Sequence, residues 1–97
     1  MTKLEMFKEA MRRELPELKK QYKIKMIGFF GSYARGEERK DSDLDVLVEF
    51  STSPDIFRFI KLENQLSDLL HVKVDLVTKG ALKPIIKDRI LGETSFL

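Results

Sequence analysis

The sequence predicts an α+β fold in which a small mixed β-sheet carries its helices on one face. Helical periodicity and short β-rich runs follow each other in the order helix, strand, strand, helix, strand, helix. So few helices cannot cover both faces of a sheet. Apolar residues make up 42% and charged residues 35% of a 97-residue chain, which is typical of one folded unit. We therefore expect residues 1–97 to form a single domain.

The first predicted helix lies near the N-terminus, where apolar residues recur at steps of three and four. Thr2 is placed to cap its start. Pro16 lacks a backbone N–H and clashes with the preceding turn, so it should break or kink the helix. We expect two helical pieces, at about 3–14 and 16–21.

Three short runs rich in β-branched and aromatic residues predict strands, at 24–30, 44–50 and 72–78. The second run alternates acidic and apolar residues near its start, which is the pattern of a strand with one polar face.

Two further helices are predicted in the C-terminal half. Ser53 can cap a helix over about 54–70, with Pro54 at its first position. The last helix has Pro84 in its first turn, where proline is tolerated. The final residues, GETSFL, either dock on the domain or wait for a partner.

Composition excludes several classes of protein. The absence of cysteine excludes disulfides and thiolate zinc sites. No segment approaches the roughly 20 apolar residues of a membrane span, and the N-terminus lacks a signal-peptide pattern. We therefore expect a cytoplasmic protein that does not bind membranes. The net charge of +2 is too balanced to indicate direct nucleic-acid binding.

Two carboxylates at the start of the second strand predict a metal site. Asp43 and Asp45 are two residues apart, so both point to the same face with Cα atoms ~7 Å apart. Like charges this close repel each other, and a bound cation removes that repulsion. Carboxylate oxygens together with substrate phosphates are the usual ligands of Mg²⁺.

A third acid lies in an otherwise apolar strand. Asp75 interrupts the run VKVDLV, where a buried and unpaired carboxylate would be costly. Placed beside the second strand, it would join the other two acids. Three carboxylates on one sheet face can hold two metal ions about 3.5–4 Å apart, as in phosphoryl-transfer enzymes.

The turn after the first strand predicts a phosphate site. Gly31 allows the backbone to come close to a ligand, and Ser32 offers a hydroxyl donor at the start of a short helix. Arg35 can add a charge-assisted contact. Ser42 is a further candidate for nucleotide binding, although a local hydrogen bond to the backbone is the competing interpretation.

The stretch at residues 28–50, GFFGSYARGEERKDSDLDVLVEF, resembles the signature of the DNA polymerase β-like nucleotidyltransferase superfamily. In that signature a Gly-Ser pair is followed, after ten residues, by Asp-x-Asp. Gly31 and Ser32 match the phosphate-binding pair, and Asp43 and Asp45 match the two metal ligands.

The third acid of that superfamily lies on a later strand and is matched by Asp75. The chain resembles the minimal nucleotidyltransferase subfamily over nearly its whole length. The resemblance lies in the segments GSYARG and SDLD, the chain length and the ending VDLVTKGALKP. This resemblance implies a polymerase β-like fold, catalysis with two Mg²⁺ ions and ATP as the substrate. It also implies an antitoxin whose partner is a HEPN-domain toxin, which some members silence by transferring AMP to a tyrosine.

Other interpretations of these residues remain open. Asp43 and Asp45 could be solvated, Asp75 could be an exposed acid on an edge strand, and Arg35 could be a free surface charge. The protein could instead be a binding module that neutralises its partner by occlusion. A third hypothesis is a nucleotidyltransferase that acts on a small molecule.

Overall fold

The computed structural model describes all residues from Met1 to Leu97. It contains four α-helices, one 3₁₀ turn and four strands. No helix is long and apolar enough to cross a lipid bilayer. Along the chain the elements are α1 (Lys3–Tyr22), β1 (Ile24–Phe30), α2 (Ser32–Arg35), β2 (Leu44–Phe50), α3 (Ile56–Leu70), β3 (Val74–Thr78), η1 (Lys79–Ala81), α4 (Pro84–Glu93) and β4 (Ser95–Phe96).

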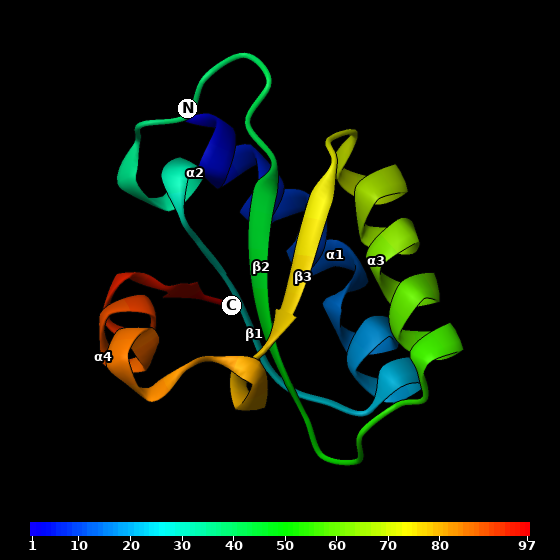
Figure 1. The fold of residues 1–97 in the computed structure, drawn as a ribbon. Helices are drawn as coiled ribbons and strands as arrows, with labels where there is room; N and C mark the ends of the chain where they lie inside the picture. The colour runs from blue at the N-terminus through cyan, green and yellow to red at the C-terminus, as the bar shows by residue number, and fades with distance from the viewer.

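The four strands form one mixed sheet in the order β3-β2-β1-β4. Strand β1 pairs antiparallel with both β2 and β4, whereas β2 and β3 run parallel. The parallel pair requires a crossover connection, which α3 supplies between the two strands (Figure 1). The predicted α+β class with a small mixed sheet is confirmed.

The main core lies between the sheet and the helices α1 and α3. Strand side chains alternate between the two faces, so Leu44, Val46 and Val48 of β2 all point toward these helices and are almost fully buried. They belong to a cluster of 15 buried residues that includes Met11 of α1 and Leu62 of α3. Helix α4 lies apart, on the side of β1 and β4 (Figure 1). On the opposite face of β2, Asp45 is partly buried near the start of the strand, and Leu47 further along is buried.

The prediction that Pro16 divides the first helix is wrong. Helix α1 is a single helix of 20 residues with Pro16 inside it. Pro16 is exposed, whereas Met11 and Leu18 of the same helix are buried in the core. Packing of the buried face thus holds the helix together across the missing N–H bond. The capping prediction is confirmed, because the Thr2 hydroxyl accepts a hydrogen bond from the Glu5 amide at 3.1 Å.

The start of α3 also differs from the prediction. Asp55 rather than Ser53 caps the helix, and its carboxylate accepts a hydrogen bond from the Arg58 amide at 2.8 Å. A carboxylate caps a helix as well as a hydroxyl does, and Asp55 directly precedes Ile56, the first residue in helical conformation. Pro54 therefore lies in the preceding loop.

Strand β3 begins two residues later than predicted. Helix α3 ends at Leu70, and the C-cap residue His71 adopts a left-handed conformation with φ of 55°. The chain needs the residues up to Lys73 to turn from the helix into the sheet, and the Lys73 carbonyl accepts a hydrogen bond from the Leu44 amide. The predicted position of Pro84, in the first turn of α4, is confirmed.

The C-terminal segment docks on the sheet. Its residues Ser95 and Phe96 pair with Phe29 and Gly28 of β1. A Cβ atom added to Gly28 would lie 2.7 Å from the Thr94 methyl carbon and 2.8 Å from the Ser95 carbonyl oxygen. The absence of a side chain at Gly28 is therefore what allows the segment to lie so close to β1.

We predict that Gly28→Ala lowers the free energy of unfolding by about 1–3 kcal/mol, because the new methyl group must push the C-terminal segment away. Gly92→Ala is the matched control, since no atom lies within 4 Å of a Cβ at this helical position. It should leave the protein equally stable or stabilise it by about 0.4–1 kcal/mol. Urea denaturation of both variants measures the difference, and equal stabilities would contradict the close packing at Gly28.

Candidate active site

The parallel register of β2 and β3 brings two of the predicted acids together. Asp45 is the direct partner of Asp75 across the two strands. Asp43 precedes β2 by one residue and lies on the same side of the chain as Asp45. Asp45 is partly buried, whereas Asp43 and Asp75 are exposed. All three predicted acids therefore lie at the same end of two neighbouring strands.

Asp45 is the most perturbed of these groups. Burial, and then the negative charges of Asp75 and Asp43, raise its pKa from 3.8 to about 6. Arg35 acts in the opposite direction. Asp43 forms an ion pair with Lys73, whose amine lies 3.9 Å from the carboxylate, and both side chains are exposed to solvent. Such a surface pair is weak, so much of the repulsion between the acids remains.

The donor set fits a divalent cation that a bound nucleotide completes. No three acidic, histidine or cysteine side chains converge closely enough to form a finished metal site. Mg²⁺, however, usually takes only one or two carboxylates, keeps several waters and binds substrate phosphates. A cation at Asp45 and its neighbours would also relieve the repulsion that raises the pKa of Asp45.

At Gly31 the backbone lies directly against the Asp45 side chain. Its φ of 77° and ψ of −154° lie in a region that favours glycine. A Cβ atom at this position would overlap the Asp45 carboxylate. Ser32 follows as the first residue of α2, so its N–H belongs to the first turn and has no acceptor within the helix. The phosphate-binding candidates and the predicted metal ligands are therefore neighbours.

Sequence reasoning missed one residue of this site. The Glu93 carboxylate, at the end of α4, accepts a hydrogen bond from the Gly31 amide at 2.8 Å. The same oxygen accepts a hydrogen bond from Arg35 at 3.0 Å, and Arg35 also donates to Glu37 at 3.0 Å. Glu93 is 62 residues from Gly31 in sequence, and only the docking of the C-terminal segment brings the two together.

Ser42 belongs to the loop that precedes β2. Its hydroxyl oxygen accepts a hydrogen bond from the Arg39 amide at 2.7 Å. The Ser42 carbonyl lies 3.5 Å from the hydroxyl of Tyr33, whose ring packs edge-on against Phe7 of α1. The side chain thus closes a local turn beside Asp43, and its contact with a nucleotide stays a prediction.

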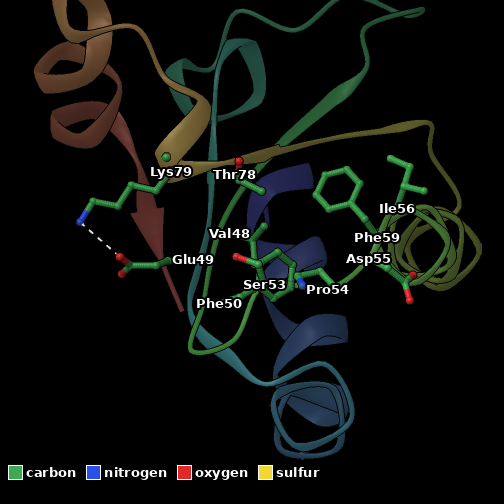
Figure 2. A pocket seen from close by; sticks show the side chains of 11 residues that line it. Val48, Glu49, Phe50, Ser53, Pro54, Asp55, Ile56, Phe59, Thr78 and Lys79 are labelled. Carbon is green, nitrogen blue, oxygen red and sulfur yellow. Dashed lines mark ion pairs between the residues drawn. The ribbon is translucent and has the colours of Figure 1, made fainter.

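A separate cavity of about 450 Å³ lies at the other end of β2. Figure 2 shows it between the end of β2, the start of α3 and the turn after β3, with the rings of Phe50 and Phe59 in its wall. Lys79 and Glu49 form an ion pair of 3.8 Å at its edge. None of the predicted site residues lines this cavity. Arg35 instead lines a second cavity, of about 590 Å³, beside the start of α1. Asp43 and Asp75 are exposed, so the acids of the candidate active site lie on an open surface at the start of β2.

Comparison with known proteins decides the family. Residues 8–97 match the nucleotidyltransferase domain family. The chain belongs to this family. The matched range spans nearly the whole chain, and the resemblance inferred from the sequence is confirmed.

Curated relatives of this nucleotidyltransferase cover nearly its full length. A Methanocaldococcus jannaschii protein assigned as a protein adenylyltransferase is 54% identical over 84 residues, which is 86% of each chain. The protein adenylyltransferase MntA of Thermococcus cleftensis is 40% identical over 97 residues, which is 100% of this chain and 98% of that one.

Solved structures share the fold. A chain assigned as a minimal nucleotidyltransferase is 36% identical, has a TM-score of 0.82 and is matched over 100% of this chain and 97% of that one. A Shewanella oneidensis complex of a tri-AMPylated HEPN toxin with an MNT antitoxin gives a TM-score of 0.67 at 20% identity, over 93% and 70% of the two chains. The predicted fold of the minimal nucleotidyltransferases is confirmed.

We predict that Asp45→Asn stabilises the free nucleotidyltransferase at pH 8 but not at pH 4. The pKa of Asp45 is about 6 in the folded chain and near 3.8 when unfolded, so folding favours its protonated form. The contribution of protonated Asp45 to the free energy of unfolding is fully present below pH ~4. It is lost as the pH rises through about 6, where the folded chain also loses this proton. Allowing for solvent screening of a half-buried carboxylate, the difference at pH 8 is about 1–2 kcal/mol.

Urea denaturation of the wild type and Asp45→Asn between pH 4 and pH 8, without divalent metal, measures this effect. Asp41→Asn is a suitable control, because Asp41 is exposed on the loop before β2. A gain that is the same at both ends of the pH range would show that packing, rather than charge, sets the stability at this position.

Proposed function

We propose that this nucleotidyltransferase is a protein adenylyltransferase that transfers AMP from ATP to a tyrosine hydroxyl of a cognate HEPN-domain toxin, and so acts as an antitoxin in the cytoplasm. The observation that carries the proposal is the pairing of Asp45 with Asp75 directly beside Gly31. Full-length relatives assigned as protein adenylyltransferases support the reaction, and the neighbouring toxin–antitoxin complex supports the kind of partner.

Each site residue has a role in this proposal. Asp43, Asp45 and Asp75 would hold two Mg²⁺ ions, which when bound neutralise phosphate charge and polarise the reacting oxygens. The triphosphate would bind at the backbone of Gly31 and Ser32. Arg35 and Ser42 are further contacts to the nucleotide in this proposal.

The transfer itself needs one proton acceptor. The oxygen of the acceptor hydroxyl attacks the α-phosphorus, the bond from that phosphorus to the bridging oxygen breaks, and pyrophosphate leaves. The hydroxyl proton passes to a carboxylate oxygen of Asp75, which is exposed and therefore accessible to an incoming substrate.

The open surface favours a protein as the acceptor. Asp43 and Asp75 are exposed to solvent, and no predicted site residue lines the cavity in Figure 2. A tyrosine on the surface of a folded partner can reach acids on an open face. The partner would also cover the nucleotide, which this small chain does not enclose alone.

We predict that Asp43→Asn and Asp45→Asn each lower AMP transfer by at least about 100-fold, because each removes a charge that holds metal and phosphate in place. Mass spectrometry of a helical HEPN partner after incubation with the protein, ATP and Mg²⁺ measures the mass added per AMP. Asp41→Asn, which alters a neighbouring exposed acid outside the motif, should transfer normally.

Retained transfer in both Asp variants would contradict the proposed site. If the wild type adds no AMP, and the double variant Asp43→Asn/Asp45→Asn still binds and inhibits the partner, neutralisation by occlusion is the correct explanation. The two results separate catalysis from binding, because occlusion does not require the acids.

A further inference from the structure

In the free chain, the Glu93 carboxylate occupies the place where the proposed function puts a nucleotide phosphate. One oxygen of the Glu93 carboxylate accepts two hydrogen bonds, from the Gly31 amide nitrogen at 2.8 Å and from an Arg35 guanidinium nitrogen at 3.0 Å. The Glu93 side chain is only 19% exposed, so it is held inside the site rather than extending into solvent. Two hydrogen bonds from donors of positive character are also what a phosphate oxygen would receive there.

Glu93 and a nucleotide phosphate cannot both accept the hydrogen bond of the Gly31 amide, although Arg35 has donors for more than one acceptor. The Gly31 backbone has a single N–H, and Glu93 already accepts it in a direct, short hydrogen bond. A phosphate oxygen at the same donor would bring two negative charges within contact distance in a partly buried place, where repulsion is stronger than in water. The negative charge of Glu93 also makes a small contribution to the raised pKa of Asp45, after burial and the charges of Asp75 and Asp43.

We propose that Glu93 is a displaceable mimic of the nucleotide's phosphate: it fills the Gly31–Arg35 cradle in the free chain and must leave when a triphosphate binds. This inference rests on the proposed role of Gly31 and Arg35 in binding phosphate. Glu93 thereby sets how tightly the chain binds nucleotide, and it keeps Gly31 and Arg35 in the positions that the phosphate later needs.

The C-terminal segment is attached in a way that permits this release. Glu93 is the last residue of α4, and β4 behind it forms only two residue pairs with β1. Short elements with few contacts open at low free energy. The close fit of Thr94 and Ser95 against Gly28 returns the segment to one place when the nucleotide leaves.

Equilibrium binding of α,β-methylene-ATP with Mg²⁺ tests the proposal, because this analogue cannot release pyrophosphate and binding is measured without turnover. Glu93→Gln removes the competing charge while keeping the size of the side chain and an acceptor oxygen. We expect it to bind the analogue about tenfold more tightly than the wild type. Glu37→Gln is the matched control, because Glu37 bonds the same Arg35 but has no bond to Gly31, and its affinity should stay close to that of the wild type.

A second measurement follows the cradle directly. The Gly31 amide signal in nuclear magnetic resonance should move when the analogue binds the wild type, as its acceptor changes from carboxylate to phosphate. In free Glu93→Gln it should already differ from the wild type. Gly28→Ala, which leaves Glu93 intact but pushes its segment away, should also tighten binding.

Ser32→Ala distinguishes failure of the proposed displacement of Glu93 from failure of the proposed phosphate site. If Ser32→Ala weakens binding but Glu93→Gln binds equally well or more weakly than the wild type, Glu93 is a fixed support and the proposed displacement is wrong. If the analogue leaves the Gly31 signal unchanged and Ser32→Ala binds it as tightly as the wild type does, phosphate does not bind at Gly31 and Ser32. The proposed role of Glu93 is then wrong as well.

Discussion

The parallel pairing of β2 with β3 is the constraint on which the site depends. It places Asp45 directly opposite Asp75, whereas a shift of one residue would turn one of the two acids into the core. The register is fixed by burial on the other face, where Leu44, Val46 and Val74 are in the core under α1 and α3. The chemistry of the exposed face is thus positioned by the packing of the opposite one.

The same division explains why like charges can gather in so small a protein. The 15-residue core stabilises the sheet from one side, and the acids of β2 and β3 face away from it. Their repulsion is a local cost that the rest of the fold offsets. Sites that are destabilising when empty are common where a ligand later supplies the missing charge.

Much of the fold and part of the site follow from the sequence alone. The strands that begin at Ile24 and Leu44 and the cap at Thr2 depend on local patterns, and these predictions are confirmed. The spacing from Ser32 to the two acids and the acid in the third strand predicted the family correctly, which the domain match confirms. The metal and nucleotide roles of these residues stay predictions.

Two features of the structure depend on long-range packing and could not be predicted from local patterns. Pro16 opposes a helix locally, but the buried face of α1 keeps the helix continuous. Glu93 carries no local signal, because its partners Gly31 and Arg35 become neighbours only after β4 pairs with β1. Contacts made by a distant segment cannot be derived from spacing within a motif.

Gly31 and Asp45 constrain each other's substitution, because their atoms share the same space. No other residue type fits at position 31 without moving the carboxylate, because any Cβ would overlap it, and the positive φ disfavours side chains as well. Substitutions at the two positions are therefore coupled, and a lineage that loses the glycine loses the acid's geometry in the same step. A copy of this chain with any other residue at position 31 would therefore have to hold the carboxylate of residue 45 in a different place.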